Sequence, residues 1–357
     1  MDRLSYSGES EYQKFINKKT LILLFLIIIL TITVLISISI GSSGLTIGEI
    51  LQVLIGKGNK QNNSIVWNVR MPRILTGVVV GIALSISGCI MQNVLRNPLA
   101  SSSTLGVTQG ASFGAAFAIV FLDAGVQVNA STASAVSISN PYAVTICAFL
   151  GGIVIITIIL GLSRIVQVTP GTMVLAGVAL SSLFTGGTTL IQYFADDVKV
   201  ASVVYWTFGD LGRAGWNQIG IIFFISLVAF IYFFYNRWNY NAMETGIDTA
   251  KSLGINVEYL IPISMLFCTL TTAVSVAFVG SISFIGLVSP HIVRRFVGND
   301  HRFLIPASAI MGAIILVLAE LVSRTVASPS ILPIGALTSF LGAPLFLYMI
   351  YKKEAFK

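Results

Sequence analysis

Few side chains in this 357-residue sequence have the types and spacing that chemistry requires. The sequence contains no Gly-x-x-x-x-Gly-Lys-Ser/Thr phosphate-binding loop, no His-Glu-x-x-His zinc pair and no Gly-x-Ser-x-Gly nucleophile elbow. Its two histidines, His291 and His301, are ten residues apart with no cysteine nearby, which favours structural roles over metal binding. The three cysteines, Cys89, Cys147 and Cys268, lie in separate apolar segments and are predicted to be packing residues. We therefore expect no catalytic site, no metal site and no cofactor, and no nucleotide hydrolysis by this chain alone.

The acidic residue Glu320 lies near one end of a long apolar segment. Ionisable groups inside a membrane are costly and usually functional, so a carboxylate at this depth is a candidate for binding a coupling proton or sodium ion. Arg324 follows four residues later, and side chains at that spacing meet on a helix. This predicted pair gives Glu320 a structural role and disfavours an ion-coupled secondary transporter, which stays open as an alternative.

The elements that position these residues are predicted to be membrane helices. Only 10% of the residues are charged and 55% are hydrophobic, whereas soluble proteins carry about 25% charged residues. A water-soluble domain is therefore excluded. Apolar runs of membrane-spanning length lie at 21–40, 72–95, 103–122, 141–163, 171–194, 216–236, 259–280, 303–323 and 332–351. A shorter run at 284–293 supplies a tenth span. We expect an all-α integral membrane protein with a ten-helix domain at 20–351, an N-terminal segment at 1–19 and a tail at 352–357.

The placement of basic residues predicts the orientation of the bundle. With ten spans, 14 of the 21 lysines and arginines fall on the side that holds both termini. The positive-inside rule assigns this side to the cytoplasm of a cell membrane. The net charge of +7 is therefore attributed to topology, and no nucleic-acid partner is expected. The seven basic residues left on the outer side are Lys57, Lys60, Arg70, Arg73, Lys199, Arg213 and Arg324.

Three of these outer residues, Arg70, Arg73 and Arg324, lie at the ends of predicted helices. Arginines in such places commonly extend to lipid head groups, and this is one interpretation. The alternative is a docking site for an acidic partner.

A polar segment at about 237–258 interrupts the apolar pattern on the inner side. Its sequence, RWNYNAMETGIDTAKSLGINVE, predicts two small helices joined by a turn, with Gly246 and Gly254 on either side of the second. The segment is either a plain connector or a surface that contacts a partner. Elsewhere, glycines four residues apart, such as Gly77 and Gly81, predict close crossing of helices.

Long motifs in the sequence resemble the FecCD family, the permease subunits of binding-protein-dependent ABC importers for ferric siderophores, haem and cobalamin. Two of the similar blocks are FIGLVSPHIVRRFVGNDHR at 284–302 and LPIGALTSFLGAPL at 332–345. A third, at 70–114, matches at Arg70, Pro72, Arg73, Gly81, Gly88, Gln92, Asn97, Pro98, Leu99, Leu105, Gly106, Gly110 and Ala111. The resemblance covers nearly the whole chain.

The resemblance implies a fold and a set of partners. It implies ten helices per subunit and two permease subunits, identical or merely related. Two cytoplasmic ATPases and an extracytoplasmic substrate-binding protein would complete the transporter. It also implies that Arg70, Arg73 and Arg324 pair with glutamates on the two lobes of the binding protein. Contact with the ATPase is implied for Thr245, Gly246, Asp248, Ala250, Leu253 and Gly254.

The same resemblance implies a pathway. Asn97 and Leu99 are similar to cytoplasmic gate residues, with Thr172 in the opposing position. Gly177 and Ser181, on the fifth span, would line the passage at the axis of the two subunits. The chain departs from the family pattern at Thr245 to Asp248 and in the turn before Thr172, so the details of both contacts are open.

The expected function is the permease of an ATP-driven importer for a ferric siderophore. Import of haem or cobalamin by the same mechanism is the nearest alternative. An ion-coupled secondary transporter is the alternative from another class. A membrane enzyme is disfavoured because the sequence contains no plausible catalytic cluster.

Overall fold

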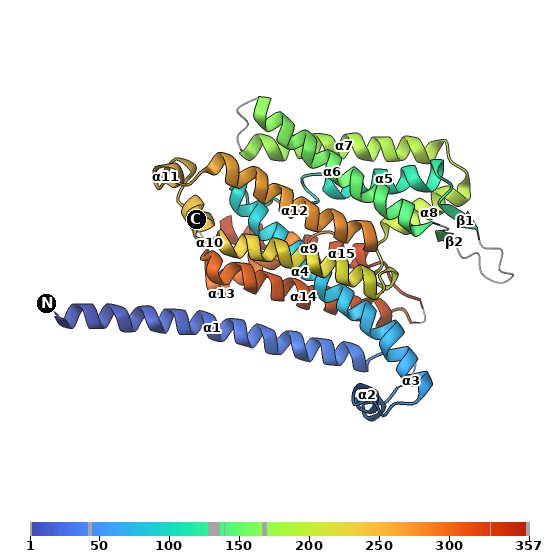
Figure 1. The fold of residues 1–357 in the computed structure, drawn as a ribbon, viewed down its shortest axis with the longest axis horizontal. Coiled ribbons are helices and arrows are strands. Elements are labelled where there is room, and N and C mark those ends of the chain that lie inside the picture. The colour runs from blue at the N-terminus through green and yellow to red at the C-terminus, as the bar shows by residue number, and fades with distance from the viewer. Residues whose placement is uncertain are drawn as a thin grey trace.

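The computed structural model describes residues 2–41, 45–127, 136–138, 140–165, 170–328 and 330–354. Ten helices run along the bundle in Figure 1: α1 (Asp2–Ser39), α4 (Met71–Val94), α5 (Val107–Phe121), α6 (Pro141–Ile165), α7 (Pro170–Tyr193), α9 (Trp216–Tyr235), α12 (Val257–Val279), α13 (Ile285–Val297), α14 (His301–Thr325) and α15 (Ile334–Glu354). Seven stretches are long and apolar enough to cross a membrane. Shorter apolar stretches lie in α5 and at 334–344 in α15, and α13 has 13 residues. The predicted ten-helix membrane bundle is confirmed.

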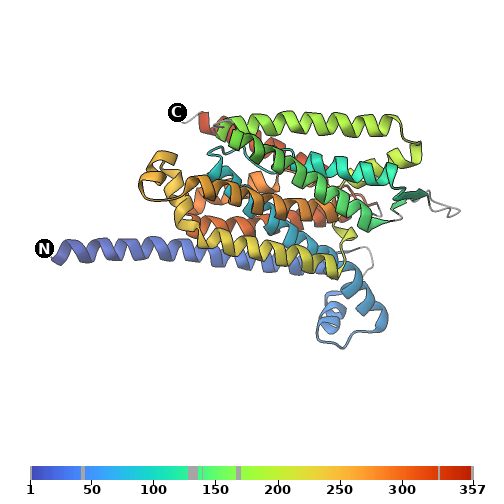
Figure 2. The ribbon, with the colours of Figure 1, turned by 45° about the horizontal axis from the view of Figure 1, so that its top comes forward.

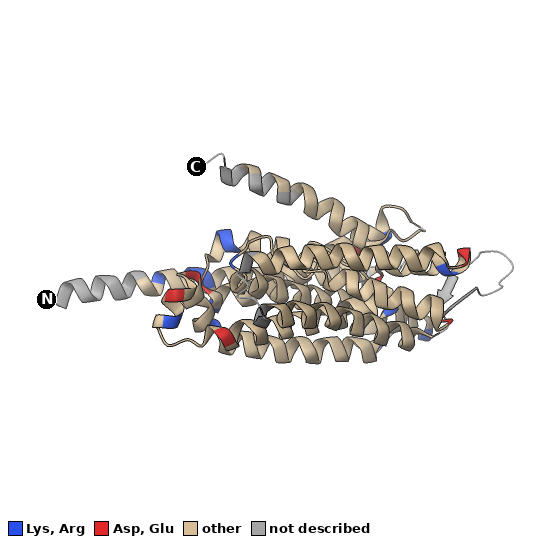
Figure 3. Ribbon diagram, turned by 90° about the horizontal axis from the view of Figure 1, so that it is seen from above, with Lys and Arg blue, Asp and Glu red and all other residues tan. Residues whose placement is uncertain are grey.

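Short elements lie at the two ends of the bundle. One end carries α2 (Ile47–Leu54), α3 (Lys60–Ser64), the π-helix η1 (Ile65–Arg70), α8 (Asp197–Thr207), the 3-10 turn η2 (Leu211–Arg213) and the antiparallel strands β1 (Gly125–Gln127) and β2 (Val136–Ile138). The other end carries α10 (Arg237–Glu244) and α11 (Ile247–Ser252). Helix α1 begins and α15 ends at the end that carries α10 and α11 (Figures 1 and 2). Charged residues gather at the two ends, with a largely uncharged stretch between them (Figure 3).

Helix α4 is the centre of the bundle, and its most extensive contact is with α14. The two helices cross where Gly81 faces Gly312, and a Cβ on Gly81 would lie only 2.5 Å from the Gly312 carbonyl oxygen. About two helical turns further on, Gly88 approaches the backbone of Gly286 on α13. Glycine is required at these crossings because a side chain would collide with backbone atoms. The predicted close crossing of helices is confirmed for Gly81.

Helix α7 lies along one edge of the bundle and packs mainly on α5 (Figure 2). Large apolar side chains on its outer face are exposed, including Leu175 at 69% and Leu183 at 66%. A helix that is apolar on a face without a partner in the same chain is covered either by lipid or by another subunit.

Helix α1 has 38 residues, so it is about 57 Å long, against a hydrocarbon thickness of about 30 Å. The N-terminal segment expected at 1–19 is therefore the first part of this helix from Asp2 onward, which projects beyond the rest of the bundle (Figure 1). The tail expected at 352–357 continues α15 as far as Glu354, and residues 355–357 lie outside the described part of the chain.

Candidate functional site

Glu320 on α14 lies between two arginines at the end of the bundle that carries α2 and α3. Its Oε1 is 2.8 Å from Nε of Arg73 on α4, and its Oε2 is 3.1 Å from Nε of Arg324. The side chain of Glu320 is fully buried, whereas those of the arginines are 12% exposed. The Nε–H groups are not aligned with the carboxylate oxygens, so both are ionic contacts rather than hydrogen bonds. The predicted pairing of Glu320 with Arg324 is confirmed, and Arg73 is a second partner that local spacing could not indicate.

Arg73 also reaches a second carboxylate. Its Nη2 donates a hydrogen bond of 2.9 Å to Oδ1 of Asp210, which immediately precedes η2. The same oxygen accepts a 2.9 Å hydrogen bond from the backbone N–H of Gly212. The Asp210 side chain is 28% exposed, so Arg73 links a buried acid to one in contact with solvent.

The other two arginines bind the end of α1. Arg324 donates a 2.7 Å hydrogen bond to Oγ of Ser37 and another to the Ser37 carbonyl. Arg70 is 5% exposed, and its Nη1 donates to the carbonyls of Ile38 at 2.5 Å and Ser39 at 3.3 Å. The last carbonyls of a helix lack partners within the helix, and basic side chains commonly satisfy them. All three arginines predicted to dock a partner thus have partners within the chain.

Removal of Glu320 and removal of Asp210 are expected to lower the stability of the folded protein by different amounts. Removing one member of a buried ion pair typically costs about 3–5 kcal/mol, because the other charge is left uncompensated away from water. An exposed pair contributes about 0–1 kcal/mol. Glu320 is therefore the structural centre of the cluster, and the contact between Arg73 and Asp210 is the weaker one.

A cavity of about 450 Å³ lies beside Arg73 at this end of the bundle. Its lining residues come from the end of η1, the start of α4 and the turn between η2 and α9: Asn68, Val69, Pro72, Arg73, Gly212, Arg213, Ala214, Gly215 and Trp216. The Arg213 guanidinium donates to the carbonyls of Tyr205 and Trp206, at 2.6 and 3.2 Å. The cavity therefore contains two guanidinium groups.

At the opposite end of the bundle, residues 237–258 form the predicted pair of small helices, α10 and α11. Gly246 and Gly254 have φ values of +135° and +83°, which favour glycine and end each helix. Thr245, Asp248 and Gly254 are exposed, Leu253 is 65% exposed, and Gly246 is half-buried. Ala250 is fully buried in the chain's own core, so it shapes α11 from within and is not part of its free surface.

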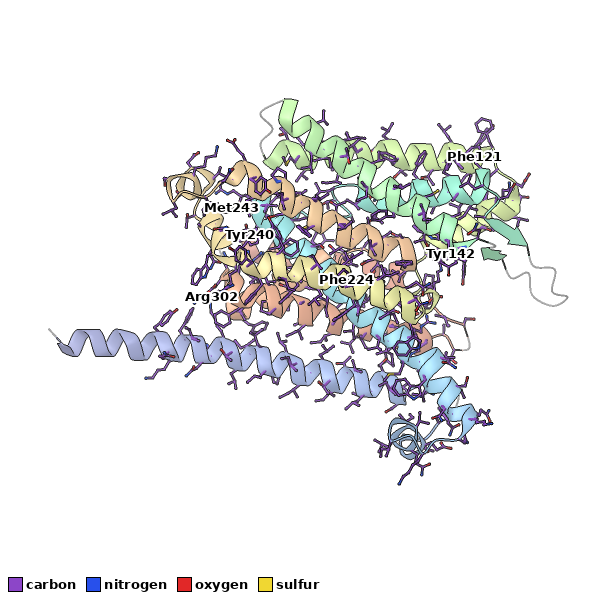
Figure 4. All side chains as sticks on the ribbon, viewed as in Figure 1. Phe121, Tyr142, Phe224, Tyr240, Met243 and Arg302 are labelled. Atoms are coloured by element: carbon purple, nitrogen blue, oxygen red, sulfur yellow. The ribbon has the colours of Figure 1, made fainter. Side chains whose placement is uncertain are left out.

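Helix α10 is tied to the bundle by buried polar contacts. Asn93, in the last turn of α4, donates to the Tyr240 carbonyl at 3.1 Å and to Glu244 at 3.3 Å. The Tyr240 hydroxyl is 2.8 Å from that of Ser264 on α12. Figure 4 shows Tyr240 and Met243 together at this end, and both side chains are fully buried. The segment is therefore not a loose connector.

A second set of contacts joins α10 to the start of α14. Asn241 donates a 3.0 Å hydrogen bond to Asp300, and its Oδ1 is 2.9 Å from Nδ1 of the buried His301. Arg302 pairs with Asp300 at 2.7 Å and donates to the Tyr12 hydroxyl of α1 at 3.2 Å. Burial alone would raise the pKa of Asp300, but hydrogen bonds from Arg302 and Asn241 outweigh it and lower that pKa. The structural role predicted for His301 agrees with this packing.

The predicted gate residues lie beside this segment. Oδ1 of Asn97 accepts a 2.9 Å hydrogen bond from the backbone of Leu99, whose side chain is 42% exposed. A polar cavity of about 310 Å³ joins this turn to α10 and α13, and its lining residues are Gln92, Asn93, Arg96, Asn97, Pro98, Glu244, Arg294 and Asn299. The sequence did not single out Glu244 or Arg294 as neighbours of Asn97.

The predicted pathway residues on α7 point in two directions. Thr172 is exposed at the start of the helix. Gly177 is buried against Leu105, and a Cβ on it would lie 2.7 Å from the Leu105 Cα. Ser181 donates to the Gly177 carbonyl at 2.7 Å and faces Gly106. Gly177 and Ser181 therefore hold α7 against α5 and do not lie on its exposed face.

The sequence that forms this architecture is similar to sequences of known proteins. Residues 29–352 match the FecCD transport family. The chain belongs to the FecCD family. A FecCD relative from Methanocaldococcus jannaschii, named as an ABC transporter permease protein, is 48% identical over 342 residues, which is 96% of this chain and 97% of that protein. The hemin transport system permease protein of Yersinia pestis is 34% identical over 213 residues, which is 60% of this chain and 64% of that protein.

A solved structure has the same fold as this FecCD chain. It is an inward-facing conformation of a protein described as a metal-chelate type ABC transporter, with a TM-score of 0.79 and 30% sequence identity. The match covers 93% of this chain and 99% of that one. In this chain, several motif residues are packing positions: Gly81 and Gly88 allow close crossings, and Gln92 donates to the Leu287 carbonyl at 3.3 Å. The chain is thus a membrane permease subunit of the ABC transporter class.

Proposed function

We propose that this chain is the membrane-spanning subunit of an importer for ferric siderophores. ATP hydrolysis would occur on separate cytoplasmic subunits, and an extracytoplasmic binding protein would deliver the substrate. The observation that carries the proposal is the family match over residues 29–352, which extends from the first helix to the last. The 30% identity to a metal-chelate type transporter supports an iron chelate as cargo. Haem, which the name of the Yersinia pestis relative suggests, and cobalamin are the alternative cargoes.

We place the substrate path along the exposed face of α7, opposite a second permease subunit. Val178, Ser182 and Gly186 lie on that face, and nothing lies within 4 Å of a Cβ built on Gly186. These residues take the pathway role expected for Gly177 and Ser181. Asn97 and Leu99 would form the cytoplasmic gate together with Thr172 of α7. The second subunit is either identical or a related permease.

Energy coupling is assigned to α10 and α11. Thr245, Asp248, Leu253 and Gly254 offer an exposed surface to an ATPase subunit, with Gly246 setting the turn between the helices. The contacts of α10 with α4, α12 and α14 would transmit a displacement to the bundle. ATP can bias outward and inward openings only if the ATPase contacts this surface differently in the two states.

Docking of the binding protein is assigned to the opposite end. Arg73 and Arg324 remain the proposed contacts for acidic side chains of that protein, because both retain 12% exposure. For Arg70 we propose capping of α1 instead. The end with α10 and α11 would then be cytoplasmic, as would both termini, in agreement with the majority of basic residues there.

The rival class is an ion-coupled transporter that uses Glu320. Among the described residues Glu320 is the only acidic side chain that is buried, and two arginines compensate its charge. A carboxylate held in this way is poorly suited to exchanging a proton or sodium ion.

The test is uptake of a ⁵⁵Fe-labelled siderophore into vesicles that contain the purified permease, with its ATPase and binding protein added in turn. We expect accumulation only when all three proteins and ATP are present. Accumulation without the ATPase, driven by a proton or sodium gradient, would establish the rival. Accumulation of haem or cobalamin but not the siderophore would keep the mechanism and change the cargo.

A further inference from the structure

The cavity beside Arg73 has the composition of a protein-docking site. Trp216 lines the cavity and is 45% exposed, and the ring of Trp67, which is 40% exposed, lies beside it with the two ring centroids 6.3 Å apart. The Trp216 indole donates to the Trp67 carbonyl at 3.2 Å, which fixes the pair. Exposed tryptophans beside arginines are typical of residues that dominate binding in protein interfaces. Arg73 and Arg213 supply the positive charge inside.

Asp210 is the acid that faces both arginines of this cavity. It bonds Arg73 directly, and its charge also acts on Arg213. Because Glu320 is already shared between Arg73 and Arg324, Asp210 brings the local charge close to balance. An acidic side chain that enters the cavity would meet Asp210 before it could use the whole charge of Arg73.

Of the two acids that contact Arg73, only Asp210 is placed so that another carboxylate could replace it. Glu320 is fully buried, forms ion pairs with two arginines and accepts a hydrogen bond of 3.4 Å from the Ser37 hydroxyl, so it stays in place. Asp210 is 28% exposed and bonds Arg73 through a single oxygen. Its backbone is held independently by a 2.7 Å hydrogen bond from its N–H to the Val279 carbonyl, so the side chain can rotate without unfolding the turn.

We propose that Asp210 is an internal competitor: it occupies Arg73 in the free permease and is displaced by a carboxylate of the extracytoplasmic binding protein. This inference rests on the proposed function, since it takes the binding protein as the partner. Asp210 would then set the affinity of the binding protein for the docking site, and the dependence of that affinity on salt concentration. Glu320 acts as a positioning residue that keeps Arg73 in place during the exchange.

The test compares two isosteric changes that remove one negative charge from the same end of the molecule. Asp210→Asn removes the competitor but keeps an oxygen for the Gly212 N–H. Asp123→Asn is the matched control, because Asp123 is 80% exposed and pairs with Lys199, away from the cavity. Association of the binding protein is measured on the permease–ATPase complex in lipid nanodiscs at low and high salt. Asp210→Ser serves as a second variant that also offers an oxygen to Gly212.

We expect both Asp210 variants to raise the association rate constant at low salt by roughly threefold or more, with a steeper dependence on salt, because attraction to an acidic partner is no longer offset. The control should change it by less than twofold. Equal effects of Asp123→Asn and Asp210→Asn would overturn the inference, as would weaker binding by the Asp210 variants. If wild-type vesicles import the siderophore but these variants behave like wild type, only this inference fails. Absence of binding-protein-dependent uptake by the wild type would instead remove the proposed function.

Discussion

Gly81 of α4 and Gly312 of α14 meet backbone to backbone, so the two central helices of the bundle touch without intervening side chains. Each of these helices carries, near one end, an arginine that pairs with Glu320 and, near the other end, a contact to α10. The crossing therefore lies between the two candidate functional regions. Closely packed helices transmit strain because they have little room to deform.

The first prediction concerns this crossing. Gly81→Ala should destabilise the permease by about 1–3 kcal/mol, because the added methyl group would overpack the crossing. A Cβ at Gly220 of α9 meets nothing within 4 Å, so Gly220→Ala is the control and should be neutral within error. The stability of each variant is measured by thermal unfolding in detergent, with the remaining folded protein detected by size-exclusion chromatography. Equal stability of the two variants would show that the helices separate easily at this point.

The second prediction concerns Glu320. Glu320→Gln should lower stability by about 3–5 kcal/mol, because it leaves two largely buried guanidinium groups uncompensated. Glu258→Gln is the control, since Glu258 is 84% exposed and pairs with Lys251 on the surface, where a pair contributes little. The same unfolding assay applies. A loss for Glu320→Gln no larger than that of the control would contradict the central role of this carboxylate.

The third prediction concerns the ATPase contact. Leu253→Glu should reduce ATP-driven uptake roughly tenfold, equivalent to about 1.4 kcal/mol, because it places a charge on an exposed apolar contact. This residue is a better probe than Gly254, whose φ of +83° makes any side chain strained. Leu122→Glu is the control, because Leu122 is 52% exposed and directly follows Phe121, which lies at the opposite end of the bundle from Met243 (Figure 4). Uptake and ATP hydrolysis are measured on the same vesicles, and full uptake by Leu253→Glu would remove this surface from coupling.

The fourth prediction concerns orientation. A cysteine at Lys57, which is exposed before α3, should react with an impermeant thiol reagent applied to intact cells, whereas one at Asp248 should react only after permeabilisation. Asn62 is unsuitable because it is 9% exposed. Cys147→Ala provides the background, since Cys89 and Cys268 are fully buried. Labelling at residue 248 in intact cells would reverse the assignment of sides.

The fifth prediction concerns pH. The folded pKa of Asp300 is lowered, so its contribution to stability is present above the unfolded pKa of about 3.9 and is lost as pH falls through the folded pKa. Asp300→Asn should therefore lower the unfolding temperature at pH 7 and bring it closer to wild type at pH 3. The measurement is the difference between the two proteins at each pH. A constant difference would mean that the Asp300 charge does not stabilise the α10–α14 contact.

The sequence predicts the ten helices because the bilayer imposes a length and a composition on each. It also predicts the Glu320–Arg324 pair, because that contact depends only on helical spacing. The contact between Glu320 and Arg73 depends on how α4 and α14 cross, which no local pattern records. The internal partners of Arg70 and Arg73 were not predicted for the same reason.

Residues 237–258 show the same difference between local features, which the sequence predicts, and packing contacts, which it does not. Glycines at 246 and 254 and the polar composition predict α10 and α11. Whether Ala250 or Leu253 faces outward depends on how α11 lies on the neighbouring helices, and Ala250 is the buried one. On α7, spacing alone does not distinguish the exposed face from the face that meets α5, where Gly177 and Ser181 pack.

The ion pairs that buried Glu320 makes with Arg73 of α4 and with Arg324 of its own helix also set an order for biogenesis. Helix α4 is synthesised before Asp210 and long before Glu320, so during insertion Arg73 has neither of its acidic partners and its charge must be solvated by water or lipid head groups. Helix α14 then brings Glu320 and Arg324 together, and Arg324 at the same time reaches the end of α1. The end of the bundle that carries α2 and α3 is therefore completed late in synthesis. A nascent chain halted before α14 would have only Asp210 as an acidic partner for Arg73, and its first helix would lack the contact with Arg324.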